Sequence, residues 1–122
     1  MEIRTIIAAG MLAFAATATA QTETKNRTTM EKLNLTQEWD KTFPQSDKVE
    51  HTKVTFTNRY GITLAADMYM PKNSEGRLPA IAVSGPFGAV KEQASGLYAQ
   101  TLAERGFLAI AFDPSFTGES GG

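Results

Sequence analysis

The residues of this sequence that could carry catalytic chemistry are a serine in a glycine-rich segment and a lone histidine. Residues 118–122 read Gly-Glu-Ser-Gly-Gly, which satisfies the G-x-S-x-G pattern found around the nucleophilic serine of many acyl-transfer enzymes. A serine hydroxyl attacks a carbonyl at neutral pH only when a base activates it. The lone histidine, His51, stands among charged residues at the entrance of a predicted strand, where we expect a solvated surface side chain.

The surroundings of Ser120 do not fit a nucleophile. A nucleophilic serine of this kind lies on a sharp turn directly between a strand and a helix. Here residues 114–118 separate the end of a predicted strand from Glu119, so the serine does not follow the strand directly. We therefore expect Ser120 to lie in a flexible turn beside a site, and we expect no nucleophile among these residues.

A second glycine-rich segment, Ser84-Gly85-Pro86-Phe87-Gly88, follows a short apolar run. Gly85 and Gly88 allow the backbone to come close to a substrate, so both are candidate substrate-binding residues. Backbone N–H groups in such a loop can stabilise the oxyanion that forms when a carbonyl is attacked. Because Pro86 has no N–H, the candidate donor is the N–H of Phe87, with Gly88 as the second choice. The alternative is a strand-to-helix turn that needs glycine only for its geometry.

The predicted elements bring these two segments to one edge of a sheet. Residues 53–57 and 62–70 alternate between apolar and polar side chains, which predicts an antiparallel hairpin with one buried face. Residues 79–83 and 107–112 are apolar throughout and predict strands buried on both faces, joined by a helix over residues 92–105. This order predicts a βαβ unit with parallel strands, whose following loops share the edge where such sheets bind ligands.

Two expectations concern the side chains of these elements. Asp67 falls on the open face of its strand and is expected to be solvated. Leu97, Tyr98 and Leu102 share one side of the predicted helix and form its apolar side.

The start of the chain has the layout of a secretory signal peptide over residues 1–20. Arg4 precedes an apolar run that ends in Ala18-Thr19-Ala20, a small-residue pattern typical of a cleavage site. The run is short for a membrane span, and the alternatives are an uncleaved anchor or a buried helix. The sequence therefore predicts an exported protein, periplasmic or secreted, that leaves the membrane after cleavage.

Residues 21–49 are predicted to form a polar linker that contains one short helix. Between residues 34 and 43, Leu35, Trp39 and Phe43 recur at helical spacing, and Pro44 follows them as a helix stop. Residues 50–122 form the predicted folded portion.

Composition excludes several classes of function. The chain of 122 residues has 12 Lys and Arg against 13 Asp and Glu, so bulk charge gives no reason to expect binding to nucleic acid or to an anionic membrane. With no cysteine and one histidine, it has no thiolate or multi-histidine ligand set, and we expect no metal. The loop at residues 84–88 matches neither G-x-G-x-x-G nor the P-loop, so no nucleotide cofactor is expected.

The order of these motifs resembles the N-terminal part of an α/β-hydrolase over about residues 50–122. Residues 84–88 stand where that family has a histidine–glycine loop that supplies an oxyanion N–H, although Ser84 replaces the usual histidine. Asp113 and the glycine- and serine-rich turn after it stand where many members have an aspartate followed by such a turn. The predicted export, together with the loop Pro86-Phe87-Gly88 and the following Lys91-Glu92-Gln93, is similar to what bacterial esterases and dienelactone-hydrolase-like members have.

The resemblance implies a serine hydrolase that acts on a small-molecule ester or a related acyl compound without a cofactor. In this fold the nucleophile is followed by the acid and then by the histidine, whereas His51 precedes every candidate serine. The sequence is therefore expected to be an N-terminal part, inactive alone, with the nucleophile and histidine beyond residue 122. The alternative is a small secreted binding module or pseudoenzyme without catalysis.

We expect cleavage after Ala20 in exported material. Intact-mass measurement of the exported protein should then give a chain that begins at Gln21, because small side chains at 18 and 20 fit the peptidase. Mature material that retains Met1 would contradict the export prediction.

Overall fold

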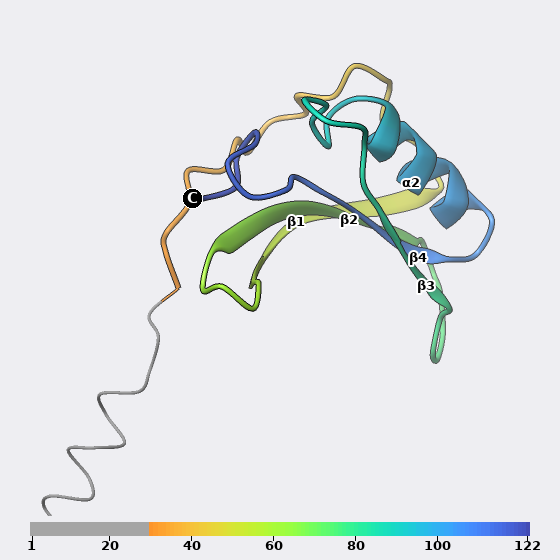
Figure 1. Cartoon of the computed structure of the whole chain (residues 1–122). Helices are drawn as coiled ribbons and strands as arrows, with labels where there is room; N and C mark the ends of the chain where they lie inside the picture. The colour runs from red at the N-terminus through yellow and green to blue at the C-terminus, as the bar shows by residue number, and fades with distance from the viewer. Residues whose placement is uncertain (1–29) are drawn as a thin grey trace, which may run out of the picture.

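The computed structural model describes residues 30–122, and the predicted signal peptide and the first part of the predicted linker lie outside this range. Within the range the chain forms, in order, β1 (Val49–Thr57), β2 (Thr63–Pro71), β3 (Ala80–Val83), α2 (Ala94–Glu104) and β4 (Leu108–Phe112) (Figure 1). No helix of residues 30–122 is long and apolar enough to cross a membrane.

The strands form one mixed sheet in the order β1-β2-β4-β3. β1 and β2 are the predicted antiparallel hairpin, with Val49 opposite Pro71 and Thr57 opposite Thr63. β2 also pairs antiparallel with β4, and β4 pairs parallel with β3. The predicted fold class, an α/β arrangement of a hairpin followed by a βαβ unit with parallel strands, is confirmed.

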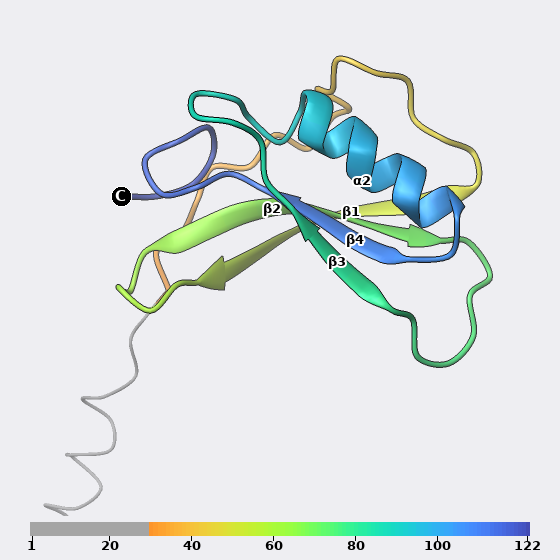
Figure 2. The same ribbon diagram turned by 45° about the vertical axis from the view of Figure 1, so that its right-hand side comes forward.

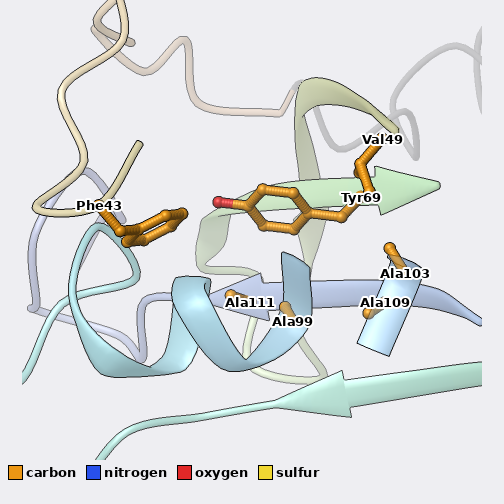
Figure 3. Packing of buried hydrophobic residues seen from close by; sticks show 7 residues of the cluster. All are labelled: Phe43, Val49, Tyr69, Ala99, Ala103, Ala109 and Ala111. Carbon is orange, nitrogen blue, oxygen red and sulfur yellow. The ribbon is translucent and has the colours of Figure 1, made fainter. Parts of the chain in front are cut away.

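Helix α2 covers one face of this sheet with small side chains (Figures 2 and 3). Ala99 and Ala103 are fully buried in one cluster with Ala109 and Ala111 of β4 and with the ring of Tyr69. Alanines on both partners let the helix lie close to the sheet, since no long side chain separates them.

The apolar side predicted for this helix does not face the sheet. Leu97 and Tyr98 are 46% and 64% exposed, and Leu102 is only partly buried at the edge of the core. The prediction was wrong because it followed the largest apolar side chains. Most buried residues of the helix are small, among them Gly96, whose added Cβ would lie 3.1 Å from the ring of Phe43.

The predicted helix over residues 34–43 does not form. The N–H of Thr42 donates to the carbonyl of Glu92 at 3.0 Å, and Nε1 of Trp39 donates to the carbonyl of Phe43 at 2.8 Å. Phe43 is buried in the core, and the ring of Trp39 packs edge-on against it at 5.6 Å between centroids. The apolar spacing therefore identified one buried side chain, Phe43, and two partly buried ones, Leu35 and Trp39. Contacts with the rest of the chain replaced helical hydrogen bonds.

The opposite face of the sheet has no helix over it within residues 30–122 (Figures 1 and 2). Along β4, Ala109 and Ala111 are fully buried, whereas Leu108, Ile110 and Phe112 between and beside them are only half-buried. Because successive side chains of a strand point to opposite faces, the large apolar side chains of β4 point away from α2.

We expect Gly96→Ala to destabilise the fold, although alanine favours helices over glycine. A Cβ at this position would overlap the carbonyl oxygen of Lys91 and crowd Phe43. Overpacking of this kind costs about 1–3 kcal/mol, which should lower the midpoint of thermal unfolding followed by circular dichroism. The matched control is Thr101→Ala, at an exposed position of the same helix. Equal midpoints for the two variants would contradict the close packing at Gly96.

Candidate functional site

The loops after β3 and β4 meet at one edge of the sheet, which we call the carboxyl edge (residues 84–92 and 113–122; Figure 2). The two strands are parallel neighbours, with Val83 opposite Ala111, so both end there. The N–H of Lys91 donates to Oδ1 of Asp113 at 2.8 Å and joins the loops directly. The segments that the sequence singled out are therefore brought together.

The loop after β3 presents Phe87 to solvent, with its side chain fully exposed. The N–H of Ala89 donates to the carbonyl of Pro86 at 3.0 Å and closes a turn around it. Gly88 has a φ of 83°, in the left-handed region that favours glycine, and a Cβ on Gly85 would lie 3.0 Å from that of Ala89. Within residues 30–122, the N–H of Phe87 donates to no backbone carbonyl. The loop thus offers a backbone donor, and the site roles of Gly85, Phe87 and Gly88 stay predictions.

Asp113, the residue after β4, is fully buried and organises the second loop. Its Oδ2 accepts from Nζ of Lys91 at 2.8 Å and from the N–H of Glu119 at 3.1 Å. Gly118 has a φ of 54°, and a Cβ there would overlap the Asp113 carboxylate. Glycine is therefore required where the loop turns back over the aspartate.

The hydroxyl of Ser120 makes hydrogen bonds with two backbone groups. Its Oγ donates to the carbonyl of Asp113 at 2.8 Å and accepts from the N–H of Ala65 at 2.8 Å. The next residue, Gly121, donates its N–H to the carbonyl of Thr63 at 2.9 Å. Ser120 lies in a turn, as expected, but the turn is fastened to β2. That Ser120 is not the nucleophile stays a prediction.

Lys91 is a buried cation surrounded by carboxylates. Its Nζ lies 2.8 Å from both Asp113 Oδ2 and Glu119 Oε2, and it also donates to Glu92. Burial alone would lower the pKa of this lysine, but hydrogen bonds to Asp113, Glu119 and Glu92 outweigh burial and raise the pKa above its ordinary range. Lys91 is therefore charged, and it neutralises carboxylates from both loops at once.

A line of alternating charges continues from this lysine to the hairpin. Glu119 also pairs with Lys53 at 2.7 Å, and Lys53 reaches Asp40 at 3.3 Å. Asp40 pairs with Lys41 at 2.5 Å, and Lys41 reaches Asp67 at 3.2 Å. We call the connected residues the ionic network: Asp40, Lys41, Lys53, Asp67, Lys91, Glu92, Asp113 and Glu119.

Glu119 is the carboxylate at the centre of this network. Burial raises its pKa, but hydrogen bonds from Lys53, Lys91 and the N–H of Thr36 outweigh burial and lower the pKa from 4.5 to about 2. The N–H of Thr36 donates to Oε1 of Glu119 at 2.6 Å. The segment before β1 is therefore bound to the same carboxylate as Lys91.

The expectations for Asp67 and His51 were wrong. Asp67 is fully buried, and its Oδ1 lies 2.7 Å from Nε2 of His51. The side chain of His51 is 15% exposed and lies between the rings of Trp39 and Tyr69, at centroid distances of 5.2 Å and 5.1 Å. The segment before β1 covers this face of the hairpin and brings Lys41 to Asp67 at 3.2 Å. The available signal was that Asp67 interrupts an otherwise apolar run.

Three carboxylates of the network gather closely enough to suggest a cation. Oxygens of Asp40, Glu92 and Glu119 lie within 4.8 Å of one another. Each is already paired with an ammonium group, Asp40 and Glu119 with Lys53 and Glu92 with Lys91. The cluster therefore has the chemistry of an ion-pair network, because lysines supply the positive charge that a metal would bring.

Curated proteins of two bacteria are similar in sequence to this chain. No family model matches it. The chain is 72% identical over 104 residues to the uncharacterized protein PA2218 of Pseudomonas aeruginosa, a match that covers 84% of this chain and 28% of the relative. It is 51% identical over 76 residues to the uncharacterized protein YcjY of Escherichia coli, covering 59% of this chain and 25% of that protein. The chain thus spans less than a third of the length of the curated relatives it matches.

Solved structures agree with the fold. The crystal structure of the hypothetical protein PA2218 gives a TM-score of 0.74 at 77% identity, over 75% of this chain and 29% of that one. Acetyl xylan esterase 1 from Thermoanaerobacterium gives 0.55 at 21% identity, over 75% of this chain and 26% of that one. The mixed sheet with its helix therefore has the fold of about a quarter of this esterase chain, consistent with the α/β-hydrolase-like resemblance.

We expect stability to depend on Glu119 in the acid range. A carboxyl whose pKa is depressed on folding contributes stability that is fully present above its unfolded value of 4.5 and is lost as the pH falls toward about 2. Glu119→Gln should lower the thermal midpoint at pH 7, and its deficit against the parent should shrink between pH 4.5 and 2. Glu75→Gln, in the exposed loop before β3, is the control. A deficit that stays constant over this range would contradict the role of Glu119.

Proposed function

We propose that this chain is the first part of an exported serine hydrolase that cleaves ester or related acyl bonds. The observation that carries the proposal is the loop after β3, where the N–H of Phe87 has no backbone acceptor within residues 30–122 and Lys91 anchors the loop to Asp113. Two further features support it: the fold is shared with acetyl xylan esterase 1, and residues 1–20 have a signal-peptide layout.

The chemistry proposed for this edge is acyl transfer. A serine Oγ attacks the ester carbonyl while a histidine takes its proton, and the carbonyl oxygen becomes an oxyanion. The histidine then gives the proton to the leaving alcohol as the ester C–O bond breaks. This chain would contribute the N–H of Phe87, aimed at the oxyanion, and the downstream polypeptide would contribute serine, acid and histidine. Water releases the acyl group, so the reaction needs no cofactor.

A rigid support for the donor matters because stabilisation of an oxyanion depends on donors that are already in place. The loop is tied at one end to β3 and at the other to the carboxylate of Asp113 through the Lys91 backbone and side chain. A buried ion pair within the fold therefore fixes the base of the loop, while Phe87 at its tip is exposed to solvent.

A non-catalytic module is the second candidate for the chain taken alone. Within residues 30–122, the hydroxyl of Ser120 donates to the carbonyl of Asp113, and the imidazole of His51 is bound to Asp67. Neither group is placed to form a serine–histidine pair with the other. The coding sequence after Gly122 separates the candidates: a nucleophile elbow followed by an acid and a histidine supports the hydrolase, and a stop codon there supports the module.

In the full-length protein we expect Phe87→Pro to lower turnover of a p-nitrophenyl ester far more than Phe87→Ala. Proline removes the proposed donor N–H and alanine keeps it, and the loss of one oxyanion donor typically lowers kcat by about 10²–10³-fold. Both variants should retain the circular dichroism of the parent. Equal turnover for two folded variants would remove Phe87 from the oxyanion site.

A further inference from the structure

Phe116, in the loop after β4, combines an exposed aromatic side chain with a backbone conformation that phenylalanine disfavours. The residue is 78% exposed and lies outside the buried apolar cluster. Its φ of 64° falls in the left-handed region, where the Cβ of most residues crowds the backbone. Asn73 is the other non-glycine residue with a positive φ in residues 30–122, and asparagine tolerates this conformation. Backbone strain of the kind seen at Phe116 concentrates at functional sites.

The loop holds Phe116 firmly in this conformation. Its N–H donates to the carbonyl of Gly121 at 2.9 Å, and the hydroxyl of the preceding Ser115 accepts from Nδ2 of Asn58 at 3.1 Å. A Cβ on Gly122 would overlap the Phe116 ring, so the chain passes close to one side of the ring. An aromatic side chain on a fixed backbone is pre-organised, which lowers the entropy cost of binding a ligand.

The loop that carries Phe116 lies at the carboxyl edge (Figure 2). Asp113 of the same loop binds the N–H and the ammonium of Lys91 in the loop after β3, and sheets of this kind bind ligands at this edge. Residues 114–118 contain no charged residue, and the carboxylates on either side of them, Asp113 and Glu119, are bound to lysine. The loop therefore presents a fixed apolar ring whose neighbouring charges are already neutralised, which suits an uncharged apolar ligand group.

We propose that Phe116 is a specificity-determining residue of the proposed hydrolase and that its ring binds an apolar chain of the ester substrate. The substrate class is an ester with a medium-length alkyl or aryl chain on its acyl or its alcohol side. In this arrangement the loop after β3 holds the carbonyl oxygen and the loop after β4 contacts the chain. This inference rests on the proposed function for the reaction, but the binding of an apolar chain does not require catalysis.

The test measures kcat/KM of the full-length protein for p-nitrophenyl octanoate and p-nitrophenyl acetate, in the parent and in Phe116→Gly. Octyl acetate and ethyl acetate make the same comparison on the alcohol side. The ratio of long-chain to short-chain kcat/KM should fall about 10-fold for one of these pairs, because two or three methylenes lose contact with the ring. The pair that responds identifies the side of the ester that carries the chain. Tyr98→Ala, which removes an exposed aromatic side chain from α2, is the matched control and should leave both ratios unchanged.

Phe116→Gly also separates substrate binding from a structural role. Glycine adopts a φ of 64° without strain, and the strain that it relieves offsets the backbone freedom that it adds to the unfolded chain. The thermal midpoint of the variant should therefore be no lower than that of the parent. A ring that is buried by other parts of the full-length protein would instead leave a cavity when removed, and the midpoint would fall.

A selective loss on one long-chain ester, with a midpoint no lower than the parent's, supports the proposal. Unchanged ratios overturn it, and a lowered midpoint assigns the ring to the core of the full-length protein and also overturns it. A full-length protein without esterase activity counts against the proposed hydrolase, and calorimetric titration with sodium octanoate then decides this inference. Octanoate binding that weakens about 10-fold in Phe116→Gly leaves the inference standing, whereas no binding, or equal binding by parent and variant, overturns it.

Discussion

The buried pair of Lys91 and Asp113 is the interaction on which the rest of this structure depends. Both side chains are fully excluded from solvent, and the lysine binds the carboxylate twice, through its backbone N–H and its ammonium. A buried charge without a partner is strongly unfavourable, and removing one member of such a pair costs about 3–5 kcal/mol. Each residue thus constrains the loop that carries the other, and the ends of β3 and β4 are held together without a large apolar contact.

The Lys91–Asp113 pair also accounts for the position of the segment before β1. Glu119 and Glu92 bring further negative charge to Lys91, and Lys53, Asp40 and Lys41 extend the alternation of charges across the hairpin. Charged side chains that are removed from water need oppositely charged or hydrogen-bonding partners. The segment before β1 supplies some of these partners, and it also shields the network from solvent. Its ordered course is therefore a consequence of burying the network, which local helix propensity could not provide.

The two faces of the sheet differ in how they are covered within residues 30–122. On the face of α2, alanines and Gly96 allow close packing, which places the start of the helix against the Lys91 carbonyl and so supports the carboxyl edge. On the face opposite α2, the large side chains of β4 remain without cover within residues 30–122. The loop that presents Phe87 to solvent is thus supported from the face that α2 covers.

The sequence by itself determined the four strands, the helix between β3 and β4, and their order. Alternation in the hairpin and continuous apolar runs in β3 and β4 are local signals of strands. The predicted burial of β3 and β4 on both faces is not seen within residues 30–122, where alternate side chains of these strands are half-buried or exposed. The local signals also located the loops that meet at the carboxyl edge. Only the tertiary structure decided which side of α2 packs, since the alanines and the glycine that allow the close approach carry little hydropathy signal. It also decided the burial of Asp67 and His51 and the path of residues 30–48, because a charge is buried only where partners distant in sequence meet it, and no local pattern specifies those partners.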